Sequence, residues 1–291
     1  MSYLRTTSLI ALSSVTVLLA ACQKSETAPA QAAAPASSQG NELKTLSIGF
    51  QKSSLNSIVL KQQHLLEKEF PKTKIEWKEF PAGPQMLEAL AVGAVDLGTV
   101  GNTPSIFAQA ADKGIVYVGY ENVHPKWQAV LVPNDSPIKS IADLKGKRIA
   151  VQKGSSAHDL LGRVLKKANL TWNDIQPIWL APADARAALD KKSVHAWAIW
   201  EPFRSAAEVE GHARPIIDGT AFETTYNFVI GNPDFVKAHI ESLPKIAALT
   251  QRQTEQVNLA ANHQQYGGQQ HTPEALSVAA QMGIDLGAPQ V

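Results

Sequence analysis

The sequence predicts an α/β protein with two similar lobes, each built around a mostly parallel sheet flanked by helices. Two observations predict this fold class. From residue 43 onward, short apolar segments typical of strands alternate with segments whose apolar residues recur at helical spacing. The second run of this alternation repeats part of the first. With 291 residues, 44% of them hydrophobic, the chain is long and apolar enough to bury such cores.

Each run contains strands that alternate with helices, which is typical of parallel neighbours joined by crossover helices. In the first run we expect strands at residues 46–50, 74–80, 96–100 and 116–120, and helices at 54–70, 84–92 and 104–113. In the second run, which starts at 126–133, we expect strands at 148–151, 175–180 and 196–199, and helices at 156–168, 182–190 and 202–210.

The two runs share a local sequence pattern. Residues 48–54 read Ile-Gly-Phe-Gln-Lys-Ser-Ser, and residues 149–155 read Ile-Ala-Val-Gln-Lys-Gly-Ser. Any two strand–helix units have similar periodicity, but the shared order of strand, Gln-Lys, turn, Ser and helix is more specific. The repeat therefore predicts two lobes of similar structure.

Residues 1–21 have the features of a secretory signal. Arg5 is their only charged residue, an apolar stretch follows at 8–20, and small residues end it. The simplest interpretation is a signal cleaved after Ala21. The sequence Leu-Ala-Ala-Cys at 19–22 also resembles the bacterial lipobox, which predicts that Cys22 is acylated and becomes the new N-terminus. Residues 22–42 then form a flexible linker, because they contain no Val, Leu, Ile or aromatic residue to bury.

Charge and cysteine content exclude several classes of function. The formal net charge is +1, which argues against nucleic-acid binding. Such a balance also gives weak long-range attraction for anions, so any bound anion must be held by local donors. The single Cys excludes an internal disulfide and a multi-thiolate metal site. The eight His residues show no metal-ligand spacing, and we expect no cofactor and no metal.

Three turns place hydroxyl groups and free backbone N–H groups at the start of a predicted helix. Helix starts carry unpaired donors and partial positive charge, and they suit tetrahedral anions. The candidate ligand-binding residues at these turns are Gln51, Ser53, Ser54, Gly101, Asn102, Thr103, Gln152, Gly154, Ser155 and Ser156. The alternative for each Ser and Thr is an ordinary helix N-cap.

The turn after residues 196–199 adds candidates of a different kind. Trp200 leaves the strand end and could cover an apolar ligand tail, whereas Trp197 is expected in the core. Glu201 could meet a ligand cation or a water, or lock the lobes together. Arg186, in the first turns of a predicted helix, could reach an anion or pair with Asp184 or Glu201.

Taken together, these segments resemble the aliphatic-sulfonate-binding proteins of bacterial ABC importers. The resemblance runs from about residue 46 to about residue 230 and rests on residues 48–52, 80–90, 95–98, 142–146, 152–156, 182–188 and 196–200. It implies a type II clamshell of the periplasmic-binding-protein kind that binds a sulfonate between its lobes. Lobe I would comprise residues 43–130 plus 230–291, lobe II residues 131–229, and the hinge crossings residues 130–133 and 227–231.

Three departures from the family pattern leave the preferred sulfonate open. Ser53 stands where the family usually has Gly, Asn102-Thr103 where Asp-Ile is more common, and His195 where Asp is usual. The chain also ends at Val291, before further helices that family members pack on the first lobe. We therefore expect a less stable first lobe.

The resemblance implies a solute-binding protein on the periplasmic or extracellular face, held to the membrane by the lipid anchor only. Its partners would be a small anionic ligand (an alkanesulfonate), an ABC permease and the ATPase of that permease; we expect a monomer that binds no nucleic acid. Taurine, sulfate esters, nitrate or a bicarbonate-like anion are alternative ligands, and taurine would need an acid near its tail, from Glu201 or Asp184. A clamshell enzyme fits less well, because similar enzymes work in the cytoplasm. A regulator's effector lobe is set aside, because no DNA-binding helix pair precedes Leu46.

Overall fold

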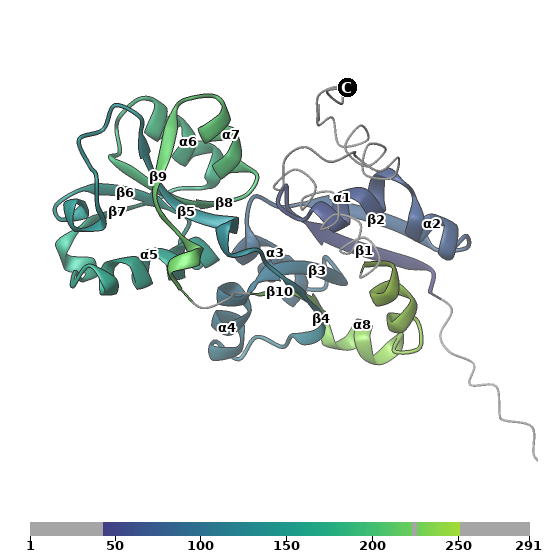
Figure 1. Ribbon diagram of the computed structural model, residues 1–291. Helices are drawn as coiled ribbons and strands as arrows, with labels where there is room; N and C mark the ends of the chain where they lie inside the picture. The colour runs from purple at the N-terminus through teal and green to yellow at the C-terminus, as the bar shows by residue number, and fades with distance from the viewer. Residues whose placement is uncertain (1–42, 223–225, 251–291) are drawn as a thin grey trace, which may run out of the picture. The chain divides into compact units, whose positions relative to one another are not determined.

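The first of two five-stranded sheets has the strand order β2-β1-β3-β10-β4 (Figure 1). Its strands are β1 (Thr45–Phe50), β2 (Lys74–Glu79), β3 (Leu97–Gly101), β4 (Val116–Asn122) and β10 (Tyr226–Gly231). Strand β1 is parallel to β2 and β3, and β10 is antiparallel to both β3 and β4. Four of the five strands therefore run in one direction, as predicted, and β10 alone is reversed.

This computed structural model describes residues 43–222 and 226–250 of the 291-residue chain. The predicted signal segment, Cys22 and the linker lie outside these residues, as does the end of the chain on which the expectation of a less stable first lobe rests. The described residues all belong to one compact unit. None of their helices is both long enough and apolar enough to cross a membrane.

The second sheet has the strand order β7-β6-β8-β5-β9. Its strands are β5 (Gln128–Pro133), β6 (Arg148–Val151), β7 (Gln176–Trp179), β8 (Ala196–Trp200) and β9 (Ala213–Asp218). Strand β6 is parallel to β7 and β8, and β5 is antiparallel to β8 and β9. The first and second sheets therefore have the same topology, with β6 in the place of β1 and β5 in the place of β10. This confirms the internal repeat that the sequence predicted.

Helices pack against both sheets. On the first sheet these are α1 (Leu55–Gln62), α2 (Leu65–Glu69), α3 (Gly83–Ala91), α4 (Asn102–Ala110) and α8 (Pro233–Ala238), and residues 243–250 are also helical. On the second sheet they are α5 (Ser156–Lys167), α6 (Pro182–Asp190) and α7 (Phe203–Val209). Short 3₁₀ turns complete the chain: η1 (Pro125–Trp127), η2 (Ile141–Leu144), η3 (Trp172–Asp174) and η4 (Gly219–Ala221).

The single helix expected at residues 54–70 is wrong, because the structure has two helices there. His64 adopts a left-handed conformation with φ of 52° and separates α1 from α2. The break lets Leu66 enter the core, where it is fully buried. Neither Gly nor Pro marks this position, so the apolar spacing alone could not reveal the break.

Each sheet receives its reversed strand from the chain that leaves the other sheet. Residues 130–133, expected as a hinge crossing, lie inside β5, and residues 227–231 lie inside β10. The chain therefore changes sheets at residues 123–127 and again after η4. The division into lobes stays a prediction, and the pairing of residues 128–130 with β8 and β9 favours a first boundary a few residues earlier than 130.

The apolar cores of the two sheets differ in continuity. The second sheet has one cluster that extends from Val130 through Leu161 to Trp197 and Trp200. The first sheet has two smaller clusters, one around Leu46 and Leu66 and one around Met86 and Leu90. Polar side chains that include Gln51, Ser54 and Thr99 are buried at the ends of the first sheet's strands. This is the region in which the candidate site lies.

Candidate functional site

A pocket lies at the carboxyl ends of β1, β3 and β8, where ligands bind in many α/β proteins. The residues that line it are Gln51, Ser53, Ser54, Thr99, Val100, Gly101, Trp127, Ser156, Trp200 and Asn227. Six of these are residues that the sequence predicted: Gln51, Ser53, Ser54, Gly101, Ser156 and Trp200. They come from both of the repeated runs, which is the arrangement that the internal repeat implied.

The turn between β1 and α1 is fixed by hydrogen bonds of its own. The Gln51 side-chain Nε2 donates to the Thr99 carbonyl oxygen at 2.8 Å, which ties the turn to the end of β3. The Gln51 backbone N–H donates to the Ser54 hydroxyl oxygen at 3.3 Å. Ser54 makes no side-chain cap to α1. The hydroxyl proton of Ser54 therefore stays available to a ligand, and the N-cap alternative does not hold for Ser54.

The repeated turn before α5 is organised differently. Ser155 is buried, its hydroxyl donates to the Gln152 carbonyl oxygen at 2.7 Å, and it accepts from the His158 backbone N–H at 3.3 Å. The N-cap alternative therefore describes Ser155. Gly154 has φ of +76° and donates its N–H to His158 Nδ1 at 3.2 Å. Among the residues of this turn that the structure describes, only Ser156 lines the pocket.

Gly101 is a point of close approach between the two repeated runs. A Cβ atom at this position would lie 3.2 Å from Ser156 Cβ and 3.3 Å from Ser156 Oγ. A side chain here would therefore fill the pocket. Helix α4 begins immediately after, at Asn102 rather than at Pro104 as expected, so Asn102 and Thr103 lie in its first turn and do not line the pocket.

Two indole rings form the apolar part of the lining. Trp200 is buried at the end of β8 and Trp127 is half-buried at the end of η1. Trp197 is buried in the core, as predicted. Glu201 does not line the pocket: its Oε2 accepts from the Ser205 backbone N–H at 3.1 Å, in the first turn of α7.

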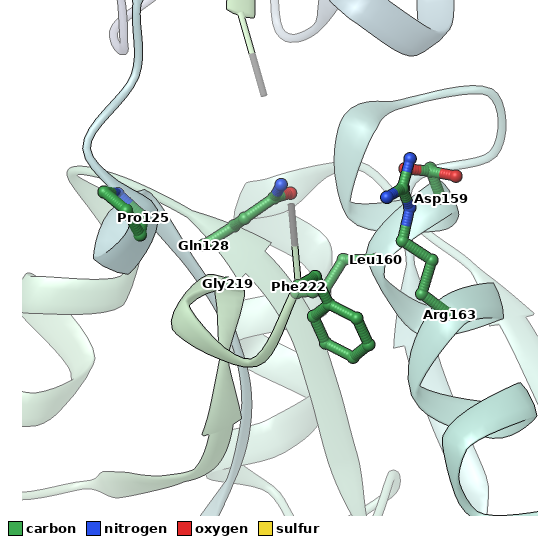
Figure 2. Close-up of a pocket in the computed structure, with 7 residues that line it drawn as sticks. All are labelled: Pro125, Gln128, Asp159, Leu160, Arg163, Gly219 and Phe222. Atoms are coloured by element: carbon green, nitrogen blue, oxygen red, sulfur yellow. The ribbon is translucent and has the colours of Figure 1, made fainter. Parts of the chain in front are cut away.

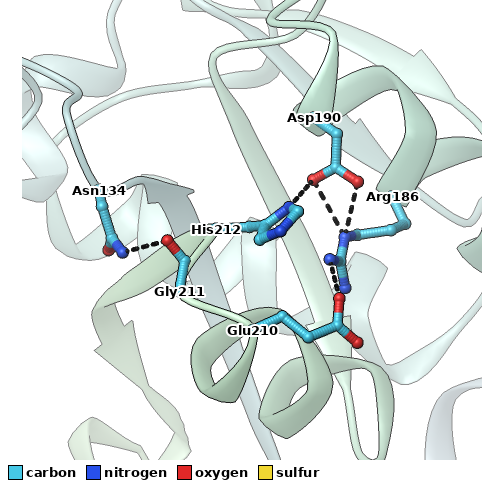
Figure 3. A network of polar contacts seen from close by, with 6 residues as sticks. All are labelled: Asn134, Arg186, Asp190, Glu210, Gly211 and His212. Carbon is cyan, nitrogen blue, oxygen red and sulfur yellow. Dashed lines mark hydrogen bonds and ion pairs between the residues drawn. The ribbon is translucent and has the colours of Figure 1, made fainter.

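Arg186 lies in a separate network of polar contacts (Figure 3). Its Nε is 2.9 Å from Asp190 Oδ2, and its Nη2 donates to Glu210 Oε2 at 2.5 Å. His212 Nδ1 lies 3.1 Å from the Asp190 carboxylate in the same network. Arg186 therefore pairs with Asp190 and Glu210, instead of with Asp184 or Glu201, and it does not line the pocket.

Of the three departures from the sulfonate-binding pattern, only Ser53 lines the pocket. Asn102 makes its contact within the first turn of α4, where the Ser105 hydroxyl donates to the Asn102 backbone carbonyl oxygen at 2.7 Å. His195 lies before β8 and accepts the Arg148 backbone N–H at 3.0 Å. Burial lowers the pKa of His195, and the nearby Arg148 and Lys147 lower it further.

Four lining residues were not predicted from the sequence: Thr99, Val100, Trp127 and Asn227. Thr99 and Val100 directly precede the predicted turn at Gly101, so their strand-end position was an available signal. Asn227 had no such signal, because β10 enters the first sheet more than a hundred residues after β3. It pairs with Gly101 on one side and Glu121 on the other.

A second pocket lies beside the connection to β5 (Figure 2). Pro125, Gln128, Asp159, Leu160, Arg163, Gly219 and Phe222 line it. Asp159 and Arg163 pair with each other across one turn of α5 at 2.8 Å, so their charges are mutually neutralised. No residue predicted as a ligand contact lines this pocket, and we take the first pocket as the candidate site.

The candidate site is lined by neutral groups. Among its ten described lining residues, hydroxyls, side-chain amides and indoles are present, and no residue carries a charge. Within the part of the chain that the structure describes, no cluster of His, Cys, Asp and Glu could hold a metal ion. Neutral donors of this kind can hold a singly charged anion without the counter-charge of Lys or Arg.

Two sheets of equal topology, with an uncharged donor-rich pocket at their strand ends, define an α/β ligand-binding protein of the periplasmic-binding-protein fold. Residues 74–264 match the family described as NMT1/THI5 like, and the chain belongs to this family.

Named relatives make the comparison more specific. The chain is 50% identical over 218 residues to an aliphatic sulfonates-binding protein of Escherichia coli K12. The aligned region covers 72% of this chain and 68% of the E. coli protein. The crystal structure of the periplasmic aliphatic sulphonate binding protein SsuA from E. coli matches with a TM-score of 0.68 and 43% identity, over 83% of this chain and 80% of that one. The alkanesulfonate-binding protein SsuA from Xanthomonas axonopodis pv. citri, bound to MOPS, matches with a TM-score of 0.75 and 41% identity, over 84% and 81%.

Proposed function

We propose that this protein is an extracytoplasmic solute-binding protein that captures aliphatic sulfonates and delivers them to an ABC permease and its ATPase. The observation that carries the proposal is the composition of the candidate site, which combines neutral hydrogen-bond donors with two indole rings. The sulfonate-binding relatives support the same ligand class.

The chemistry of a sulfonate suits these groups. A sulfonate stays singly ionised at physiological pH and offers three acceptor oxygens. Ser53, Ser54 and Ser156 can each donate a hydroxyl proton to it, and a charge-assisted hydrogen bond contributes about 1.5–3 kcal/mol. A few such bonds are enough for micromolar affinity, which corresponds to about 8 kcal/mol.

The indole rings favour a ligand with a carbon tail. Trp127 and Trp200 line the same pocket as the hydroxyls, and burial of each CH₂ group contributes about 0.8 kcal/mol. Nitrate and bicarbonate-like anions have no tail and could not use these rings. We therefore prefer alkanesulfonates, and we propose that the ligand is bound and released without chemical change.

Cys22 and the segments beside it, outside the described residues, complete the proposal. We propose that residues 1–21 are a lipoprotein signal, that acylated Cys22 holds a monomer at the outer face of a membrane, and that residues 22–42 act as the tether. Labelling of growing cells with an alkyne fatty acid tests this. The full chain should carry the label and the Cys22→Ser variant should not; an unlabelled full chain would rule out the anchor.

Isothermal titration calorimetry with methane-, ethane- and butanesulfonate tests the function itself. We expect micromolar binding that strengthens with tail length, because longer tails bury more apolar area against the indoles. Sodium nitrate is the matched anion without a tail. Failure of all three sulfonates to bind would overturn the proposed function, and nitrate binding as tight as that of butanesulfonate would overturn the role of the tail.

A further inference from the structure

Three neighbouring strands of the first sheet place Gly101, Asn227 and Glu121 in one row. Asn227 on β10 is paired with Gly101 on β3 and with Glu121 on β4, in antiparallel register on both sides. Directly opposed residues of antiparallel strands present their side chains to the same face. Asn227 and Glu121 therefore share a face with Gly101, where the absence of a side chain leaves room for the pocket.

Glu121 holds the amide of Asn227 in one orientation. The Glu121 carboxylate accepts a hydrogen bond from Asn56 Nδ2 at 2.6 Å, and the side chain of Asn227, on the neighbouring strand, also lowers the pKa of Glu121. A carboxylate only accepts, so Asn227 must turn its NH₂ group toward Glu121. Its Oδ1 then points the other way, and this oxygen lies 3.8 Å from the place where a Gly101 Cβ would be.

The row therefore presents an amide oxygen, which can only accept, to a pocket whose hydroxyl groups can both donate and accept. Asn227 lines the pocket, whereas its partner Glu121 does not. Burial raises the pKa of Glu121, and the hydrogen bonds from the Asn56 and Asn227 amides oppose that rise. A half-buried carboxylate behind the amide makes Oδ1 more negative, because hydrogen bonds in a chain polarise one another.

A sulfonate group cannot form a hydrogen bond with Asn227 Oδ1, because a sulfonate group carries only acceptors. A hydrogen-bond donor elsewhere on the ligand can. We propose that Asn227, positioned by Glu121, determines specificity for sulfonates whose tail carries a hydroxyl or ammonium group. This inference rests on the proposed function, since it assumes that the sulfonate binds in this pocket. Glu121 is a positioning residue in this arrangement and Asn227 the group that touches the ligand.

Calorimetry with three ligands that share the same two-carbon chain tests the inference: ethanesulfonate, 2-hydroxyethanesulfonate and taurine. We expect the wild-type protein to bind at least one of the donor-bearing ligands about tenfold more tightly than ethanesulfonate, as one added hydrogen bond would give. The hydroxyl and ammonium ligands show which donor the row prefers. The test quantity is the dissociation constant of ethanesulfonate divided by that of the tighter donor-bearing ligand. In Asn227→Ala and in Glu121→Gln this ratio should fall to about one.

The ratio separates specificity from structural damage, because a variant that only loosens the site weakens all three ligands equally. Asn122→Ala, at an exposed position of the same strand as Glu121, is the matched control and should keep the wild-type ratio. If ethanesulfonate binds wild-type protein as tightly as both other ligands, the inference is wrong and the proposed function stands. If none of the three binds, the proposed function fails and the inference fails with it. Should one of the two variants not fold, the other still tests the role of Asn227.

Discussion

The two sheets have the same topology but contribute different chemistry to the candidate site. Elements of the first sheet supply Gln51, Ser53, Ser54, Thr99, Val100, Gly101 and Asn227, whereas the second sheet and the turn before it supply Trp127, Ser156 and Trp200. The first sheet has a divided apolar core with polar side chains buried at its strand ends; the second has one continuous core that reaches Trp200. The first sheet therefore supplies most of the polar lining of the pocket, whereas the second sheet and the turn before it supply both indole rings and one hydroxyl.

The largest effect is expected from a side chain placed at the first sheet's point of close approach. In Gly101→Val the new atoms would meet Ser156 and the side chain of Asn227. Gly101 has φ of −65°, which any residue can adopt, so the fold should survive. We expect the affinity for ethanesulfonate to fall about 100-fold, which corresponds to the loss of one or two charge-assisted hydrogen bonds.

Gly119→Ala on β4 is the matched glycine control for this titration. Its Cβ would have no neighbour nearer than 4.0 Å, so its dissociation constant should equal that of the wild type. Unchanged binding in Gly101→Val would show that the ligand occupies another place.

A smaller and more selective effect is expected on the aromatic side. Trp127→Ala removes a half-buried ring from the pocket. We expect butanesulfonate to lose about tenfold in affinity and methanesulfonate much less, because only the longer tail reaches enough apolar area. Trp179→Ala is the control, since Trp179 is 42% exposed and lies outside the pocket. Equal losses for both ligands in Trp127→Ala would contradict the division between head and tail.

Substitution of Arg186 tests whether this residue contributes to ligand binding or only to stability. Because Arg186 pairs with Asp190 and Glu210 away from the pocket, Arg186→Ala should leave the dissociation constant unchanged. Its unfolding free energy should fall by about 1 kcal/mol, since the charges it pairs with are partly exposed. Chemical denaturation and calorimetry on the same sample measure both quantities. A tenfold loss of affinity without loss of stability would assign Arg186 to the ligand.

The smallest effect concerns Asp143, which belongs to the capping box of the 3₁₀ turn η2. Asp143 accepts from the backbone N–H groups of Lys139 and Ser140, and these bonds hold its pKa below the ordinary value of 3.8. A lowered pKa means that the folded state favours the charged form. The stabilisation is therefore present above pH 3.8 and is lost as the pH falls through the lower folded-state pKa.

Chemical denaturation of wild-type protein and Asp143→Asn at several pH values measures this contribution. The difference in unfolding free energy should shrink as the pH falls from 5 toward the acid limit of the fold. Asp184→Asn, at an exposed position of α6, is the matched control. A difference that grows with acid would show that the sign is wrong.

Local sequence predicted the elements as far as residue 210, apart from the break at His64, because each strand and helix carries its own apolar pattern; it did not predict β9, β10 or α8. It also predicted Gln51, Gly101, Ser156 and Trp200 as lining residues, since each stands at the end of a predicted strand or the start of a helix. Local sequence could not separate Ser54 from Ser155, which both precede a helix; only their hydrogen bonds distinguish a free hydroxyl from a cap.

The place of Asn227 in the site depended on information that local patterns do not hold. Asn227 reaches the site because β10 inserts between β3 and β4, a pairing between distant segments. The partner of Arg186 was visible in principle, because Asp190 stands four residues later on the same helix. The predicted pairing with Asp184 or Glu201 was therefore wrong for a reason that the i,i+4 spacing of Arg186 and Asp190 already shows.

A crystal structure with bound butanesulfonate tests the central claim most directly. The account predicts that sulfonate oxygens lie within hydrogen-bond distance of the Ser53 or Ser54 hydroxyl and of Ser156, and that the butyl tail contacts Trp127 and Trp200. A sulfonate group bound against the indoles, or a ligand found in the pocket beside Gln128 and Arg163, would contradict it.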